Sequence, residues 1–167
     1  MRPWTPSIDV RIAGMDDVAA VSEILREASD WADTIGAKMW QLDELSPARL
    51  GGDVTAGLFH LAWDGGTAAG TIKFQLDDPE FWPDDPGDHA AYVHRLAVRR
   101  RYAKRGISQA LLAYAADRTR TIGRRVLRLD CDAERTALRN FYERFGFQPH
   151  SYRLVGPYYV MRYELSV

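Results

Sequence analysis

The chain has 167 residues, of which 46% are hydrophobic and 27% are charged, and its formal net charge is −1. This length and composition suit one globular domain with a sizeable core, so we predict a single domain over residues 1–167. The near-neutral charge argues against bulk binding to nucleic acid or to an anionic membrane, and the one cysteine, Cys131, cannot form an internal disulfide.

The N-terminal part of the chain predicts a strand followed by two helices. Its first ten residues, MRPWTPSIDV, lack the apolar core of a signal peptide, and no later apolar run is long enough to span a bilayer, so we predict a cytoplasmic protein. Apolar residues alternate with polar ones over 8–12, as in a strand. Asp16 is then placed to cap a helix that Gly36 ends. A short second helix is predicted over 46–52, begun by a Ser-Pro pair and ended by a Gly-Gly pair.

A hairpin and a polar loop are predicted next. Strand-like runs over 58–63 and 68–76 flank the turn sequence Asp64-Gly65-Gly66, which favours a tight reversal of the chain. From 77 to 88 the sequence DDPEFWPDDPGD is rich in proline and carboxylates, which is typical of a loop.

The most informative stretch runs from Tyr92 to Leu112 and has the sequence YVHRLAVRRRYAKRGISQALL. Its β-branched and apolar residues predict a strand over 92–98, and apolar residues at helical spacing after Gly106 predict an amphipathic helix. The turn between them carries five basic residues. Because the first N–H groups of a helix lack intrahelical partners and the helix dipole is positive there, this arrangement predicts a phosphate or pyrophosphate site. A solvated basic surface is the alternative, and the Walker-type and dinucleotide-binding sequence patterns are absent.

The C-terminal part predicts a strand, a helix and a final hairpin. Gly123 ends the amphipathic helix, and the apolar residues after it predict a strand over 126–129. Apolar residues at helical spacing predict a helix over 138–145, and strand-like runs follow over 152–155 and 158–163. The resulting order βααβββαβαββ indicates an α/β fold with a mixed, mostly antiparallel central sheet flanked by about four helices.

Two segments of the chain together resemble the GNAT acyltransferase superfamily. YVHRLAVRRRYAKRGISQALL is similar to the acetyl-CoA-binding core of that family. LRLDCDAERTALRNFYERFGF is similar to the strand and helix that follow it, ending in the family's signature at Tyr142 to Phe147. The predicted elements agree in order as well, so the resemblance covers nearly the whole chain. It implies a single GNAT-like domain that uses acetyl-CoA as co-substrate, and the spacing of His, Cys and carboxylates predicts no metal site.

The resemblance also implies which residues hold the coenzyme. The main chain of Leu96, Ala97 and Val98 would pair with the pantetheine arm like an added strand. The pyrophosphate would be held around the basic turn, by Lys104, Arg105, Gly106, Ile107 and Ser108. Two positions depart from the family pattern: Ala103 replaces a side chain that is usually a cation or an amide, and Arg135 stands where many relatives carry an asparagine. Main-chain N–H groups supply most of the contacts to a pyrophosphate, so the site can survive these changes.

The catalytic candidates come from the same resemblance. An amine acceptor with a pKa of about 10.4 must lose a proton before it attacks a thioester. His94 occupies the strand position where many relatives place a catalytic glutamate, so it is the candidate base; Asp130 is the reserve, and a core histidine is the alternative. Tyr142 is the candidate acid for the departing thiolate, although it also lies on an apolar helix stripe and can serve packing alone. Cys131 is expected to be a small buried residue and not a nucleophile.

The acceptor is predicted to be a primary amine of a small molecule. Carboxylates and aromatic rings of the loop over 77–88 either attract a cationic amine or form only a solvated surface; they are Asp77, Asp78, Glu80, Phe81, Trp82, Asp84 and Asp85. Trp31, Met39 and Trp40 either line an acceptor pocket or, as the simpler role, pack in the core.

Other functions are weighed against small-molecule acetylation. The acceptor can instead be a protein N-terminus or a lysine side chain. Ala103 and Arg135 also make a non-catalytic acyl-CoA-binding module conceivable. Nucleic-acid binding through RRRYAKR is disfavoured by the acidic remainder of the chain. The oligomeric state, monomer or homodimer, stays open.

Overall fold

The structure is a computed structural model that describes residues 7–37, 39–85 and 87–167. Residues 1–6, which belong to the N-terminal segment from which the compartment is predicted, lie outside the described residues, as does Pro86 of the acidic loop. Within the described ranges, no helix has the length and apolar character needed to cross a membrane.

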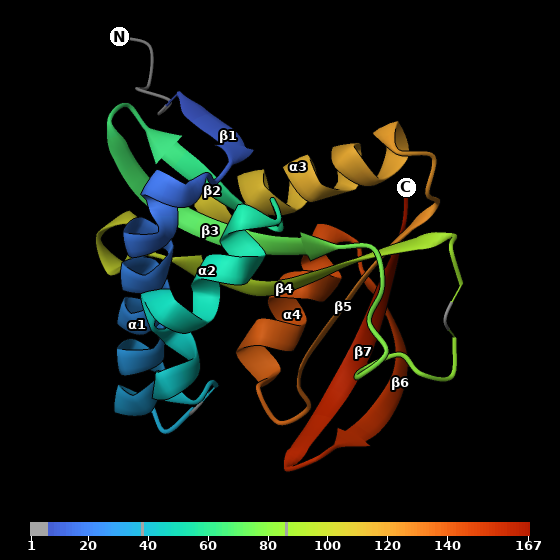
Figure 1. The fold of residues 1–167 in the computed structure, drawn as a ribbon. Helices are drawn as coiled ribbons and strands as arrows, with labels where there is room; N and C mark the ends of the chain where they lie inside the picture. Colours follow the sequence, from blue (N-terminus) through green and yellow to red (C-terminus); the bar gives the residue numbers. More distant parts are fainter. Residues whose placement is uncertain (1–6, 38, 86) are drawn as a thin grey trace, which may run out of the picture. The chain divides into compact units, whose positions relative to one another are not determined.

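The helices and strands follow one another in the predicted order (Figure 1). In the described residues they are β1 (Ile8–Ile12), α1 (Val18–Thr34), α2 (Pro47–Thr55), β2 (Phe59–Asp64), β3 (Thr67–Gln75), β4 (Ala90–Val98), α3 (Ile107–Thr121), β5 (Val126–Asp132), α4 (Thr136–Phe145), β6 (Gln148–Val155) and β7 (Tyr158–Ser166). The strands are neighbours in the order β1-β2-β3-β4-β5-β7-β6. The pairs β1–β2, β2–β3, β5–β7 and β6–β7 are antiparallel, and β4–β5 is parallel. The predicted α/β fold with a mixed, mostly antiparallel sheet and four helices is confirmed.

Two predicted helix boundaries were wrong. Asp16 does not cap α1, because a short 3-10 helix (Met15–Asp17) precedes it and the Asp17 carboxylate accepts a hydrogen bond from the Gly14 N–H at 2.8 Å. Helix α2 begins as predicted, with the Ser46 hydroxyl accepting from the third residue beyond it, but it continues through the two glycines to Thr55. The helix continues because Leu50 and Val54 are buried on one face, and that burial outweighs the weak helix propensity of glycine.

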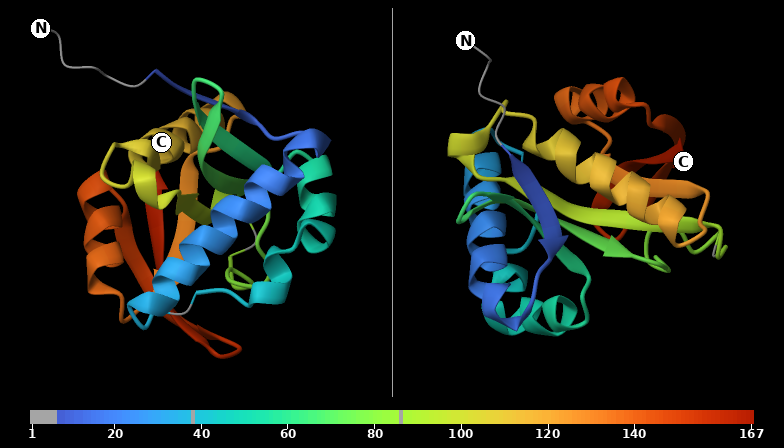
Figure 2. Two further views of the ribbon diagram at one scale, coloured as in Figure 1. Left: turned by 90° about the vertical axis from the view of Figure 1, so that its left-hand side faces the viewer. Right: turned by 90° about the horizontal axis from the view of Figure 1, so that it is seen from above.

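The chain divides into two compact units. The first unit is Met1–Lys73 with Arg95–Leu112, and the second unit is Phe74–His94 with Ala113–Val167. In the first unit, α1 and α2 pack side by side, as both views of Figure 2 show. Their apolar faces meet residues of β2 in one core, which includes Ile24, Leu25, Leu45, Leu50, Phe59 and Leu61. Met39 and Trp40 pack against this core, so the simpler of their two expected roles is confirmed.

A glycine in β3 sets how closely α3 approaches the sheet of the first unit. A Cβ atom on Gly70 would lie 2.9 Å from the Ala97 carbonyl oxygen and 2.9 Å from Cγ2 of Ile107, which is closer than side chains pack. The missing side chain therefore lets the first turn of α3 and the end of β4 lie directly against β3.

The second unit holds the long antiparallel hairpin of β6 and β7, drawn in red in Figure 1, with β7 also paired to β5. The parallel β4–β5 ladder in this unit is short and runs from Ala90↔Val126 to Tyr92↔Arg128. Beyond that point β4 continues to Val98 and β5 to Asp132. The residues just past the end of the ladder are the ones that form the candidate site.

Candidate active site

His94 and Asp130 occupy matching positions beyond the β4–β5 ladder. His94 lies two residues after Tyr92, and Asp130 lies two residues after Arg128, the last paired residues of the two strands. Because side chains alternate along a strand, both point to the same face as that last pair. The backbone of β4 is irregular immediately afterwards, since Arg95 has a φ of 55°, which residues other than glycine seldom adopt.

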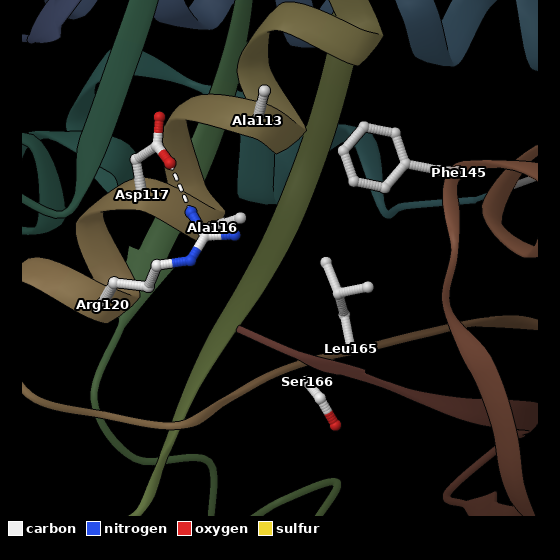
Figure 3. A pocket seen from close by; sticks show the side chains of 7 residues that line it. All are labelled: Ala113, Ala116, Asp117, Arg120, Phe145, Leu165 and Ser166. Atoms are coloured by element: carbon white, nitrogen blue, oxygen red, sulfur yellow. Dashed lines mark hydrogen bonds and ion pairs between the residues drawn. The ribbon is translucent and has the colours of Figure 1, made fainter.

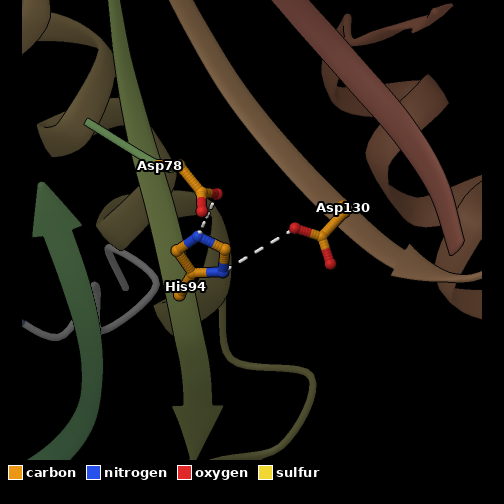
Figure 4. Close-up of side chains that lie close together, drawn as sticks. All are labelled: Asp78, His94 and Asp130. Carbon is orange, nitrogen blue, oxygen red and sulfur yellow. Dashed lines mark hydrogen bonds and ion pairs between the residues drawn. The ribbon is translucent and has the colours of Figure 1, made fainter. Parts of the chain in front are cut away.

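The imidazole of His94 lies between two carboxylates (Figure 4). Its Nε2 is 2.7 Å from Oδ2 of Asp78, and its Nδ1 is 3.7 Å from Oδ2 of Asp130. The shorter distance is that of a charge-assisted hydrogen bond, so we assign the Nε2 proton as donated to Asp78. In the neutral ring Nδ1 then carries the lone pair that can accept a proton. The His94 side chain is 21% exposed.

Asp130 is a buried carboxylate with few compensating contacts. Its side chain is only 10% exposed, and no hydrogen-bond partner to Oδ2 is found among the described residues. Burial raises the pKa of Asp130 to about 6, with the negative charges of Asp78 and Glu80 acting in the same direction and His94 opposing them. The carboxyl group therefore titrates close to neutral pH, in the range where a proton can be exchanged with a substrate.

Asp78, His94 and Asp130 also lie close enough together to suggest a metal site, which the sequence did not predict. One ligand atom from each falls within 4.8 Å of the others. The two ring nitrogens of His94, however, face different carboxylates, and one ion cannot be bound by both nitrogens of a single imidazole. An ion at this place would therefore be bound through one ring nitrogen, and the other nitrogen would keep its carboxylate partner.

Two carboxylates of the acidic loop are held by buried arginines. Asp84 and Asp85 are bound to Arg162 and Arg128, whose side chains are 4% and 1% exposed. These hydrogen bonds hold the pKa of both carboxyl groups below the usual range. Both guanidinium groups also lie over the ring of buried Trp82. Asp84, Asp85 and Trp82 therefore anchor the loop, and Trp82, which is 1% exposed, does not present its ring to a ligand as the sequence suggested.

Tyr142 lies on α4 with its ring almost fully buried. It packs edge-on against Phe141 and Phe147, so the packing role considered from the sequence is confirmed. Burial raises the pKa of Tyr142 well above its usual range, and the nearby thiol of Cys131 and carboxylate of Asp130 act in the same direction. The phenol therefore stays protonated at neutral pH and can still donate a hydrogen bond. Burial also raises the pKa of Cys131 to about 12, which argues against a nucleophilic thiolate.

The basic turn before α3 belongs to the first unit, and its residues have two different roles. Arg99 is structural, because its Nε donates to the Ala68 carbonyl at 2.7 Å and its Nη1 donates to Glu27 at 3.3 Å. Glu27 also accepts the backbone N–H of Arg100, whose guanidinium lies 4.1 Å from the ring centroid of Trp31. These contacts fix the start of the turn, and Trp31 contributes to them by packing against Arg100.

The end of the turn has the geometry of an anion-binding cradle. Lys104 and Gly106 have φ values of 60° and 81°, and α3 begins at the next residue, Ile107. Left-handed residues just before a helix turn successive N–H groups toward one side, where the first N–H groups of the helix add to them. Lys104 and Arg105 are exposed beside this cradle, and open space surrounds the Cα of Gly106. The residues present therefore fit a diphosphate group.

A separate groove of about 260 Å³ lies in the second unit (Figure 3). It is lined by Ala113, Ala116, Asp117, Arg120, Phe145, Leu165 and Ser166, and Arg120 donates a hydrogen bond to Asp117 at its edge. None of the candidate catalytic residues lines this groove, so it is not part of the candidate active site.

Comparison with known proteins agrees with the fold. Residues 22–147 match the family model described as the acetyltransferase (GNAT) family. The fold and this match define the protein as an acetyltransferase. Since the match spans most of the sequence, the chain belongs to the GNAT family, and the resemblance found in the sequence is confirmed.

Individual relatives are distant in sequence and close in fold. The chain is 28% identical over 139 residues to the uncharacterized N-acetyltransferase YesJ of Bacillus subtilis, covering 80% of this chain and 77% of YesJ. A GNAT acetyltransferase of Listeria monocytogenes is 19% identical with a TM-score of 0.78, covering 96% of this chain and 95% of the other. The PaiA N-acetyltransferase of Thermoplasma acidophilum, solved in complex with coenzyme A, is 20% identical with a TM-score of 0.74, covering 93% and 98%.

Proposed function

We propose that the protein transfers the acetyl group of acetyl-CoA to a primary amine of a small molecule, by direct attack within a ternary complex. The observation that carries this proposal is the His94 imidazole, whose Nε2 is bound to Asp78 and whose Nδ1 faces Asp130. Family membership makes acetyl transfer the class of reaction, and an ordered imidazole beside a buried carboxylate suits the removal of a proton from an amine.

Acetyl-CoA would be bound by the first unit. The N–H groups at the start of α3 and the cradle around Gly106 would hold its diphosphate, and Lys104 and Arg105 would add charge. The main chain of Leu96, Ala97 and Val98 would pair with the pantetheine arm. The complex of PaiA with coenzyme A supports the choice of this coenzyme.

His94 would act as the general base. An alkylamine is mostly protonated at neutral pH, so it must give up a proton before its nitrogen can attack the thioester carbonyl. With its Nε2 proton donated to Asp78, the ring would take this proton on Nδ1, and the negative charge of Asp130 would stabilise the resulting imidazolium. Asp130, whose pKa lies at about 6, is the alternative base at the same place.

Tyr142 would act as the acid for the leaving thiolate. Its phenol remains protonated across the physiological range, and Asp130 and Cys131 lie close enough to affect its ionisation. When the C–S bond of the tetrahedral intermediate breaks, a donated proton prevents a charged thiolate from accumulating. Direct transfer of this kind needs no covalent enzyme intermediate, in keeping with the protonated, buried Cys131.

The test is release of free thiol from acetyl-CoA in the presence of an amine panel that contains small alkylamines, polyamines, amino acids and peptides with free N-termini or lysines. The proposal expects turnover with at least one small amine and slower turnover with the peptides. Turnover only with peptides would replace the small-molecule acceptor by a protein. Binding of acetyl-CoA without turnover on any amine would leave a coenzyme-binding module and refute the enzyme.

A further inference from the structure

Arg162 makes more contacts to the acidic loop than a simple ion pair requires. Its two Nη atoms donate to the two carboxylate oxygens of Asp84 at 2.7 and 3.0 Å, and Nη1 also donates to the Phe81 carbonyl at 3.0 Å. Nε and Nη2 both donate to the Ser151 hydroxyl on β6. The fork of the guanidinium thus joins β7 and β6 to two points of the loop, and its side chain is only 4% exposed.

One of those two points leads directly to the candidate base. The backbone N–H of Phe81 donates to Oδ1 of Asp78 at 3.2 Å, and Oδ2 of Asp78 accepts from Nε2 of His94 at 2.7 Å. The Phe81 ring lies 5.6 Å from the His94 ring, centroid to centroid. A continuous series of contacts therefore runs from Arg162 through Phe81 and Asp78 to His94.

The loop is fixed on its other side by a second buried arginine. Arg128 donates to the side chain and the carbonyl of Asp85, and Trp82 lies beneath the guanidinium groups of both arginines, at 4.2 and 4.5 Å. Trp82 is 1% exposed, so the part of the loop around it is packed within the second unit. The position of the Asp78 carboxylate is consequently set by contacts made far from it in sequence.

We propose that Arg162 is a positioning residue for His94: acting through Phe81 and Asp78, and oriented by Asp84, it holds the imidazole in one tautomer and one orientation. The effect of Arg162 on the tautomer and orientation of His94 is a property of the protein without substrate. Its kinetic consequence rests on the proposed function, since only an acetyltransferase that uses His94 as base would lose turnover when the ring is released. Arg162 itself does not touch the reacting atoms in this assignment.

The test compares three variants with the wild type. Arg162→Lys keeps the positive charge and loses the planar guanidinium with its several donors. Asp84→Asn removes the charge of the carboxylate that binds Arg162, at a side chain that is half exposed. Asp53→Asn is the matched control, because it breaks a comparable ion pair, with Lys73, in the first unit. The first measurement is ¹⁵N NMR of the histidine side chains, which reports the tautomer of His94 without any substrate, and His60 in the first unit serves as internal reference.

The wild type and Asp53→Asn are expected to show His94 as a single Nε2–H tautomer, and the other two variants a mixture of tautomers. In turnover assays, kcat should fall roughly tenfold in Arg162→Lys and less in Asp84→Asn, with the KM for acetyl-CoA unchanged. If Arg162→Lys does not fold, the result for Asp84→Asn tests the proposal alone, because a half-exposed side chain tolerates this substitution. An unchanged His94 signal in folded Asp84→Asn, or a mixture of tautomers in the wild type, overturns the proposal. If the His94 tautomers change in the variants but the wild type acetylates no amine, the positioning role of Arg162 stands and the proposed function is refuted.

Discussion

Asp130 and Arg162 are direct partners in the ladder between β5 and β7, yet the Arg162 guanidinium binds Asp84 and Ser151. Oδ2 of Asp130 has no hydrogen bond among the described residues, although a cation lies on the neighbouring strand. A buried carboxylate oxygen without a hydrogen bond destabilises a fold unless another function retains it. This relationship leads to the first prediction.

Asp130→Asn should make the protein more stable at neutral pH. Because burial raises the pKa of Asp130 from 3.8 to about 6, the folded state binds this proton more tightly than the unfolded state. Stability contributed by this group is therefore present below pH 4 and is lost as the pH rises through 6. The amide removes that loss, so we expect the free energy of unfolding at pH 7.5 to rise by roughly 1–3 kcal/mol.

Chemical denaturation of the wild type and Asp130→Asn at pH 4.5 and pH 7.5 measures this difference. The gain should be much smaller at the lower pH, where the wild-type carboxyl group is protonated in the folded state. A variant that is less stable than the wild type at pH 7.5 would show that the ionised carboxylate of Asp130 is well compensated in the folded protein, contrary to this prediction.

His94→Ala should lower kcat most at neutral pH, by about 10²–10⁴-fold, which is the usual contribution of a general base. Part of the rate should return as the pH approaches 10, because the amine then loses its proton without help. The pH profile of kcat for both proteins measures this effect. A loss that is equal at every pH would mean that His94 serves only the structure, and Asp130 would become the base to test.

Tyr142→Phe should lower kcat by about tenfold or more and leave the KM for acetyl-CoA unchanged, because the lost hydroxyl acts after coenzyme binding. The phenyl ring keeps the edge-on contacts with Phe141 and Phe147, so the free energy of unfolding should change by less than about 1 kcal/mol. Steady-state kinetics and thermal unfolding are the measurements. Wild-type turnover in a stable variant would leave Tyr142 with its packing role alone.

Gly106→Ala should weaken coenzyme A binding and destabilise the fold by about 1 kcal/mol. Nothing lies within 4 Å of the added methyl group, so the effect comes from the φ of 81°, which alanine adopts at a cost. Gly52→Ala is the matched control, because Gly52 lies inside α2 with open space around it and alanine should stabilise that helix. Calorimetry with coenzyme A should show weaker binding for Gly106→Ala only; equal binding by both variants would place the diphosphate elsewhere.

Local sequence patterns were sufficient to predict most of the fold. Alternation and helical spacing depend on neighbouring residues, and they predicted the strands and α-helices of the described residues in order, but not the short 3-10 helices. The boundary of α2 was missed because burial of Leu50 and Val54, and not local propensity, decides where it ends. The prediction placed the N-cap of α1 at Asp16 and not at Asp17, because a short 3-10 helix shifts the start of α1 by one residue.

The site was only partly predictable, for a related reason. His94, Asp130 and Tyr142 are candidates because the family resemblance points to their strands and helix, and the structure brings His94 and Asp130 together. Asp78 was missed as the partner of His94, since it lies 16 residues away in a proline-rich loop and no spacing rule connects the two. The pairing of Asp84 with Arg162 spans 78 residues, and no local pattern could show that this acidic side chain is neutralised.

The position of α3 depends on the absence of a side chain at Gly70. Since Gly70 has no Cβ, the helix that begins at Ile107 lies on bare β3 backbone. A larger residue at position 70 would push the start of α3 away from β3 and would move the main-chain donors around Gly106 with it. Gly70 would thus affect these donors without contacting a ligand itself. A mutational scan confined to the basic turn would therefore leave out a residue on which the proposed diphosphate site depends for its position.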